Sequence, residues 1–286
     1  MFSATAAAQQ LHFESVFNSV LTEVQDIPGT VTLHNGTWKG KPFVSGGAER
    51  PSVALQKELI ITGDVNGDGK SDAAAFLVST TGGSGTQLNL ALFIHNGLLL
   101  MNKQNVWLGD RVQIRSAKID STGVIEITLI RTGERDAMCC PGEIVQRRWK
   151  WEGTGLKELP QVHIGRLSVA SLAGYQWRLE SWKEGEPVDT NTAVTMRFSG
   201  ENVNGRSACN QYFASVKDGV NLGDITIKSA GTTKMMCSPE FMTTEDRYMR
   251  IFRSAVHFRF VFSKLHLEYE EHGVTNSLIF RREPGS

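Results

Sequence analysis

The chain has 286 residues, in which 30 lysines and arginines balance 30 aspartates and glutamates. This length suggests two domains, and the ordinary apolar content suffices for a core. Neutrality and the lack of a basic block argue against nucleic acid as a partner. No apolar run is long enough for a transmembrane helix.

The first ten residues, MFSATAAAQQ, are small and alanine-rich, like the end of a signal peptide at an A-x-A cleavage site. No charged or apolar region precedes them. They are either the remainder of a trimmed signal peptide or an accidental likeness. We favour the trimmed signal, because the calcium-type loop and the paired cysteines described below also suit a periplasmic, extracellular or cell-surface protein.

Residues 12–24 predict a short amphipathic helix, because their apolar side chains recur at helical spacing, and Pro28-Gly29 should end it. Beyond this helix, short apolar segments are separated by Gly, Asn and Asp at the spacing expected of an all-β domain. The strands predicted in this half span residues 31–33, 37–39, 59–62, 73–78, 88–95, 98–102, 113–119, 124–130 and 145–151.

Between two of these strands lies the sequence GDVNGDGKSD, residues 63–72. Its side-chain oxygens fall at positions 1, 3, 5 and 9 of an EF-hand-like loop, and its position 7 would offer a backbone carbonyl. Gly69 stands at position 6, where the chain must turn sharply. The residues predicted to surround a structural calcium ion are Asp64, Asn66, Asp68, Lys70 and Asp72.

The neighbouring residues decide what kind of loop this is. Position 12 is Ala75 instead of a bidentate Glu, which excludes an EF-hand, and both flanks are predicted strands. The stretch resembles the calcium loops of FG-GAP and thrombospondin-type repeats. A P-loop is excluded because Asp64 stands where that motif needs glycine. The remaining alternative is an Asx- and Gly-rich turn without metal.

Two further segments of the first half are distinctive: Leu108–Val112 and Cys139-Cys140-Pro141. Together with the loop, they resemble a module that accompanies exported bacterial proteins, and this resemblance implies no activity. Residues 153–163 contain two glycines and a proline and predict a linker. The predicted division is therefore a β-rich domain at residues 10–158 and a second domain at residues 170–283.

The second domain carries several motifs in a characteristic order: LAGYQWRL (172–179), VTMRF (194–198), SACNQYF (207–213) and TTKMMC (232–237). Together they resemble the META domain, the family of the heat-shock lipoprotein HslJ. The resemblance implies a small β-barrel-like sheet with one helix, set in the bacterial envelope. It offers no catalytic residues to carry over. The fold class expected for the whole chain is mainly β with few helices, in two β-rich domains.

The residues themselves support one helix in this domain. Ser238 can cap it, Pro239 suits its first position, and Glu240 favours the positive end of its dipole. Three strands, at residues 258–262, 264–269 and 277–281, should follow it. An apolar stripe at helical spacing indicates core contact rather than a ligand site: Phe241, Tyr248, Phe252 and Ala255.

Four cysteines allow three complete pairings. In the META-like domain, Cys209 and Cys237 lie in two signature segments, so the resemblance implies a disulfide between them. Such a bridge would stabilise the fold by about 3.5 kcal/mol in the chain-entropy treatment. The alternative is two buried thiols in a cytosolic protein.

Cys139 and Cys140 are adjacent, with Cα atoms about 3.8 Å apart across a trans peptide, which is below the usual disulfide range. A bridge between them would be strained and comparatively easy to reduce. The alternatives are a structural vicinal disulfide, a redox-responsive pair or two packed thiols, and we favour the structural bridge. Zinc is disfavoured because there is no C-x-x-C and no nearby histidine.

No catalytic motif is recognisable, since there is no H-E-x-x-H and the seven histidines are scattered. The leading hypothesis is a non-catalytic, exported envelope protein with structural calcium and a binding or envelope-stress role. Its partner would be an envelope protein or a small ligand. The alternatives are a protease inhibitor or small-ligand carrier built on the META-like barrel, and a hydrolase with a site between the domains.

Overall fold

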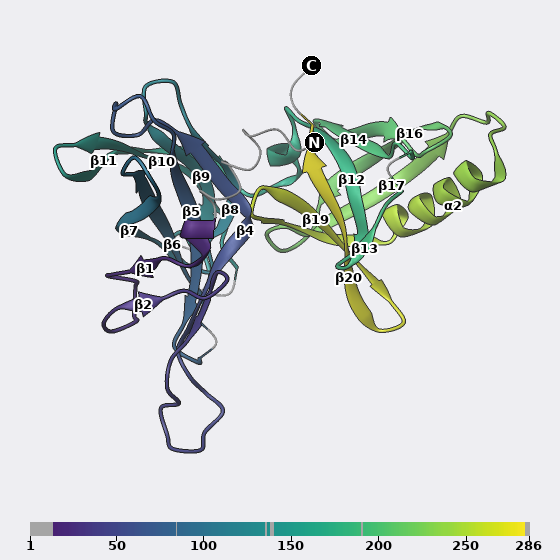
Figure 1. The fold of residues 1–286 in the computed structure, drawn as a ribbon. Helices are drawn as coiled ribbons and strands as arrows, with labels where there is room; N and C mark the ends of the chain where they lie inside the picture. Colours follow the sequence, from purple (N-terminus) through teal and green to yellow (C-terminus); the bar gives the residue numbers. More distant parts are fainter. Residues whose placement is uncertain (1–13, 84, 135, 138–139, 190, 284–286) are drawn as a thin grey trace, which may run out of the picture. The chain divides into compact units, whose positions relative to one another are not determined.

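The computed structural model describes residues 14–83, 85–134, 136–137, 140–189 and 191–283. The chain divides between Ile164 and Gly165 into two compact units, which are treated separately below (Figure 1). The prediction of a mainly β protein with few helices is confirmed. A helix of one turn at residues 14–17 and helix α2 (Pro239–Arg253) are its α-helical elements in the described part of the chain.

The first unit contains two antiparallel sheets and a small hairpin, β1 (Val20–Leu21) with β2 (Val31–Thr32). The five-stranded sheet follows chain order: β3 (Thr37–Lys39), β4 (Ser52–Gly63), β5 (Asp72–Thr80), β6 (Gln87–His95) and β7 (Leu100–Asp110). The four-stranded sheet has the order β11-β10-β9-β8: β8 (Gln113–Ile119), β9 (Ile125–Arg131), β10 (Glu143–Glu152) and β11 (Gly155–Arg166).

The middle of the five-stranded sheet is covered on both faces, because nearly every residue of β5 and β6 is buried. On one face, Ala75 and Phe93 belong to the same buried cluster as Val16, Leu21 and Val31 from the N-terminal helix turn and the hairpin. The two sheets approach each other closely at Gly63, where an added Cβ would lie 2.6 Å from Cγ2 of Ile119. Glycine is therefore needed at this crossing.

The predicted helix over residues 12–24 is wrong beyond its first turn. Residues 12 and 13 lie outside the described residues, and the helical turn ends at residue 17. The Asn18 side chain ends it: Nδ2 donates to the Glu14 carbonyl at 3.1 Å, and Oδ1 accepts the Asn35 N–H at 3.0 Å. Asn competes with the helix for backbone groups, and the chain then pairs as a strand.

The prediction of a linker at residues 153–163 is also wrong, because residues 155–166 form strand β11. Gly153, with φ of 62°, lies in the turn that joins β10 to β11, so the glycine marks a hairpin rather than a flexible connection. Pro160 is tolerated because β11 is the edge strand of its sheet. Leu156 donates its N–H to Gln104 Oε1 at 2.7 Å, which ties β11 to β7.

The second unit is one nine-stranded antiparallel sheet preceded by a 3₁₀ turn, Val169–Leu172. Its principal order is β17-β16-β15-β14-β12-β20-β19-β18, and β13 also pairs with β12. The strands are β12 (Gln176–Lys183), β13 (Glu186–Pro187), β14 (Thr195–Ser199), β15 (Asn202–Arg206), β16 (Gln211–Asp218), β17 (Ile225–Thr232), β18 (Ala255–Val261), β19 (Lys264–Glu271) and β20 (Val274–Arg282).

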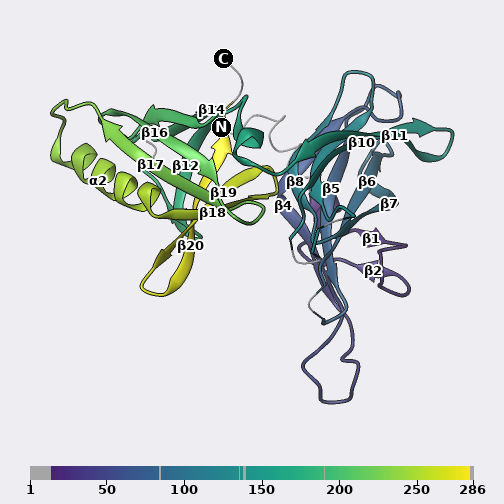
Figure 2. The same ribbon diagram turned by 180° about the vertical axis from the view of Figure 1, so that it is seen from behind.

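This sheet curls into a half-barrel whose two end strands meet at one point (Figures 1 and 2). A bridge joins Asp224 to His257, and Phe258 donates its N–H to the Gly223 carbonyl at 2.7 Å. Helix α2 connects β17 to β18 and directs Tyr248 and Phe252 into the core, both fully buried. These two residues confirm part of the predicted helical stripe, whereas Phe241 is only half-buried and Ala255 lies in β18, beyond the end of the helix.

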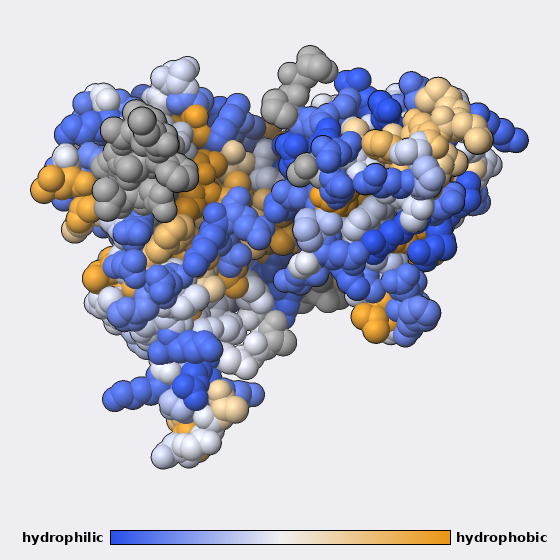
Figure 3. Space-filling model, turned by 45° about the vertical axis from the view of Figure 1, so that its right-hand side comes forward, coloured by the Kyte–Doolittle hydropathy of each residue, from blue (hydrophilic) through white to orange (hydrophobic). Residues whose placement is uncertain are grey.

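The start of α2 is as predicted, with Ser238 at the N-cap and Pro239 in the first turn, although the Ser238 side chain makes no capping hydrogen bond. No described helix is long and apolar enough to cross a membrane. Hydrophilic residues dominate the face in Figure 3, where hydrophobic residues form separate groups.

Candidate functional site

The predicted calcium loop connects β4 to β5, and the Asp64 carboxylate lies at its centre. Asp64 Oδ1 accepts the N–H groups of Gly67 at 2.7 Å and Asp68 at 3.1 Å, while Oδ2 accepts that of Gly69 at 2.8 Å. Gly67 and Gly69 have φ of 78° and 81°, which suits glycine and lets the amides turn inward. The loop therefore closes around its own carboxylate.

Asn66 and Asp68 complete the turn. Asn66 Oδ1 accepts the Asp68 N–H at 3.0 Å, and Asp68 Oδ1 accepts the Lys70 N–H at 2.8 Å. The hydrogen bond from the Lys70 backbone is the main cause of a lowered pKa at the exposed Asp68 carboxyl. Calcium would have to replace or share these amide contacts, because a hard cation needs the same oxygens.

Asp72 occupies a different environment from the other loop residues, since it is fully buried. Its Oδ2 accepts the N–H groups of Val65 at 2.9 Å and Asn66 at 3.3 Å, and its Oδ1 accepts that of His95 at 2.9 Å. Asp72 thus joins the loop to the ends of β5 and β6. The described residues hold no group of three or more His, Cys, Asp or Glu side chains arranged for a metal ion.

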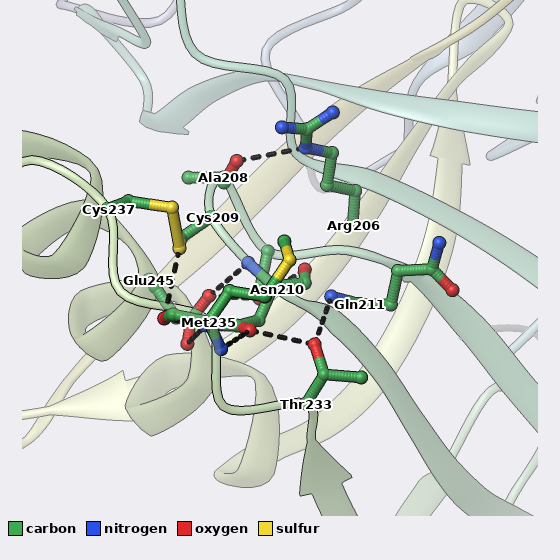
Figure 4. The surroundings of a disulfide bond; sticks show 10 residues. Arg206, Ala208, Cys209, Asn210, Gln211, Thr233, Met235, Cys237 and Glu245 are labelled. Atoms are coloured by element: carbon green, nitrogen blue, oxygen red, sulfur yellow. Dashed lines mark hydrogen bonds between the residues drawn. A yellow bond between two sulfur atoms is a disulfide. The ribbon is translucent and has the colours of Figure 1, made fainter.

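In the second unit, a buried polar cluster joins the β15–β16 turn to helix α2 (Figure 4). Glu245 on α2 is 6% exposed, and its Oε2 accepts the Ser207 hydroxyl and the Asn210 N–H, both at 2.7 Å. Its Oε1 accepts Asn210 Nδ2 at 3.0 Å. A buried carboxylate is costly unless hydrogen-bonded, and here both oxygens have donors.

Asn210 also holds the segment that leads into α2. Its Oδ1 accepts the Thr233 hydroxyl and the Met235 N–H, both at 2.7 Å, and its Nδ2 donates to the Met235 carbonyl at 3.3 Å. The adjacent residue, Cys209, is bonded to Cys237, with Cα atoms 5.9 Å apart. The disulfide predicted from the resemblance is therefore present, and it fastens the same two segments as Asn210.

A pair of buried tyrosines lies beside this cluster. The hydroxyls of Tyr212 and Tyr248 are 2.7 Å apart, and Tyr212 donates to the Thr195 carbonyl at 3.0 Å. Burial raises the pKa of both hydroxyls above the ordinary tyrosine value. Both groups therefore remain protonated at neutral pH, which suits hydrogen bonding in the core better than proton transfer.

The polar cluster was missed from the sequence, although one signal for it exists. Glu245 lies four residues after Phe241 and three before Tyr248, so it falls on the apolar stripe of the helix. A charged residue on a buried helical face requires partners. Of the other predicted disulfide residues, Cys139 lies outside the described residues and Cys140 is exposed.

The comparisons with known proteins include a family-model match to the second unit. The half-barrel with one packed helix, a buried polar cluster and a disulfide is a small structural module. Residues 170–281 match the model of the META domain family, so this part of the chain is a META domain.

A solved structure was also matched, the NMR structure of a protein from Burkholderia xenovorans. The two sequences are 18% identical, the match covers 41% of this chain and 87% of that one, and the TM-score is 0.32. No curated protein matches the chain.

Proposed function

We propose that this protein is a non-catalytic, HslJ-like envelope protein, exported to the periplasm or cell surface. The observation that carries the proposal is the Cys209–Cys237 disulfide within the META domain. Structural disulfides persist in oxidising compartments and are rare in the cytosol. Its role is to bind an envelope partner or to maintain the envelope under stress.

The buried cluster supports the non-catalytic part of this proposal. Ser207, Asn210 and Glu245 have the chemistry of an active site, but each is at most 6% exposed. Their polar atoms bond to one another and to the backbone of the 233–235 segment. Groups used in this way position chain segments, whereas a catalytic group must reach a substrate.

Structural calcium in the first unit is a further part of the proposal. Asp64, Asn66 and Asp68 lie in one turn with two positive-φ glycines, and each accepts a backbone N–H of that turn. Residues 67–71 of this loop are exposed, so a cation from solvent would compete with the amide contacts for the same oxygens. Asp72 would act behind the site by fixing the loop ends through its three backbone contacts.

The experiment combines fractionation with thiol mapping in the native host. The endogenous protein should occur in the periplasmic or surface fraction, and a non-reduced digest should contain the linked Cys209 and Cys237 peptides. Cross-linking in that fraction, with and without calcium, would identify the envelope partner. Recovery in the cytosol with both thiols free would overturn the proposal.

A protease inhibitor is a second candidate function, favoured by the loop between β3 and β4. Phe43 is 61% exposed and Val44 is 72% exposed near its tip, while Gly40 and Pro51 close its base through an N–H···O bond of 2.8 Å. An exposed apolar tip on a closed loop is the shape that enters a protease cleft. The test is to assay the protein against a panel of envelope proteases. Inhibition that is lost in the Phe43→Ser variant would support this function over the first.

A further inference from the structure

The first unit contains a hollow of about 400 Å³ where the end of β7 faces β9, β10 and β11. This volume is within the range of small-molecule sites. Its apolar wall includes Trp107 and Val112, and its polar wall includes Arg131, Thr132 and Gln161. A few polar groups opposite an apolar wall is the composition expected of a site for a small organic molecule.

The Arg147 side chain joins the walls of the hollow through hydrogen bonds. The Arg147 guanidinium, whose side chain is 14% exposed, bonds both oxygens of Glu158 at 2.7 and 2.8 Å. Its Nη1 also donates to the carbonyls of Trp107 and Leu108, at 3.3 and 3.2 Å, so Arg147 links β10 and β11 to β7. Arg147 therefore shapes the hollow, and most of its own donors are already used.

The indole of Trp107 is fixed as well, because Nε1 donates to Gln87 Oε1 at 2.8 Å while the residue stays 49% exposed. A half-exposed ring held in one orientation offers a flat surface for an apolar group. Asp110 also borders the hollow, but its carboxylate already accepts the Arg111 guanidinium at 2.7 Å and the Thr86 N–H at 2.8 Å. Its negative charge is thereby largely compensated.

Arg131 is a cation at this hollow whose guanidinium has hydrogen-bond donors available for a ligand. Its Nε bonds Glu143 Oε2 at 2.7 Å, and across the described residues nothing accepts a hydrogen bond from its two terminal amino groups. The side-chain groups of Thr132 and Gln161 likewise have no protein partner in the described parts of the chain, and both border the same hollow. A guanidinium with two parallel donors matches a carboxylate geometrically.

We propose that this hollow binds a small carboxylate with a flat apolar body. The carboxylate would accept both terminal amino groups of Arg131 and hydrogen bonds from Thr132 and Gln161, while the body would pack on Trp107 and Val112. A volume of 400 Å³ equals that of about 13 liquid waters, which suits an aromatic acid of about ten heavy atoms. The site does not depend on the envelope location or on calcium.

The test uses the full chain and the probe phenylacetate, with binding followed by calorimetry and by ligand-observed NMR. Phenethyl alcohol has the same ring without the charge, and acetate has the charge without the ring. Both should bind at least about tenfold more weakly, which is the effect of losing about 1.4 kcal/mol. A peptide ending in phenylalanine, with a free or an amidated terminus, distinguishes a small acid from a chain end.

Arg131→Met should weaken phenylacetate binding at least about tenfold, whereas Arg50→Met removes an exposed arginine outside the hollow and should leave it unchanged. Thr132→Trp fills the hollow without removing the Arg131–Glu143 pair and should abolish binding even if Arg131→Met folds poorly. The proposal is overturned if phenylacetate does not bind the unmodified protein at about 10 mM, or if Thr132→Trp binds it normally.

Discussion

Asn210 donates twice to one carboxylate: its N–H lies 2.7 Å from Oε2 of Glu245 and its Nδ2 lies 3.0 Å from Oε1. The two residues are 35 positions apart, and their contact joins the β15–β16 turn to helix α2. Because Asn210 also binds the backbone of Met235, one side chain holds three segments of the META domain together.

Glu245→Ala should destabilise the protein by about 3 kcal/mol, because it leaves two buried N–H donors of Asn210 without their acceptor. The Ser207 hydroxyl can still donate to the Asn210 carbonyl, which lies 2.9 Å away. Urea unfolding would measure the loss. Asp246→Ala changes the next, exposed residue of the same helix and should alter the stability by less than about 0.5 kcal/mol. Equal effects of the two substitutions would contradict a structural role for the cluster.

The disulfide should contribute about 3.5 kcal/mol, since Cys209 and Cys237 are separated by 28 positions. The double variant Cys209→Ser/Cys237→Ser should therefore unfold at a lower urea concentration than the unmodified protein. It should also lose most of the response of the META domain to reductant. If reductant still lowers the stability of that domain by the same amount in the double variant, the stabilisation comes from elsewhere.

Acid should weaken the second unit through His266. Burial, together with Arg259 and Lys264, lowers the pKa of this histidine from 6.5 to about 4. The unfolded chain therefore binds the proton more readily between pH 6.5 and 4. The free energy of unfolding should therefore have its full value above pH 6.5. It should fall by at most about 3 kcal/mol as the pH drops to 4.

His266→Gln should flatten this part of the pH profile of the free energy of unfolding. His272→Asn is the matched control, because His272 is exposed and has φ of 54°, which asparagine tolerates. The assignment fails if the two variants change the slope equally.

Calcium should raise the melting temperature of the first unit, because a ligand that binds only the folded state stabilises it. Asp68→Ala should remove most of this gain with little effect in its absence, since Asp68 is exposed. Asp72→Ala should destabilise the unit even without calcium, because it leaves the amides of Val65 and His95 without their acceptor. If calorimetry detects no binding at millimolar calcium, the loop is a turn without a metal site.

The position of β11 predicts where the chain tolerates division. A fragment of residues 10–158 ends inside this strand and removes its last two thirds, whereas a fragment of residues 10–166 keeps all of β11. The longer fragment should therefore melt at a higher temperature, and residues 165–286 should unfold cooperatively by themselves. Equal melting temperatures for the two N-terminal fragments would show that the end of β11 contributes nothing.

Local signals in the sequence determined much of the fold. Short apolar segments separated by Gly, Asn and Asp predicted the strand at residues 113–119 with its observed ends, and Ser238-Pro239 predicted the start of α2. The META signatures implied the Cys209–Cys237 pairing. These features were readable because turn, capping and periodicity signals lie within a few residues of the structure that they produce.

Only the tertiary structure decided the remaining features, because they depend on residues distant in sequence. Residues 153–163 have the composition of a linker, but contacts with Gln104 and Arg147 make most of them part of an edge strand. Asp72 reads as a loop ligand, yet burial against His95 gives it a structural role. The hollow beside Arg131 likewise exists only because two sheets bring β7 next to β9, β10 and β11, and no local pattern encodes that approach.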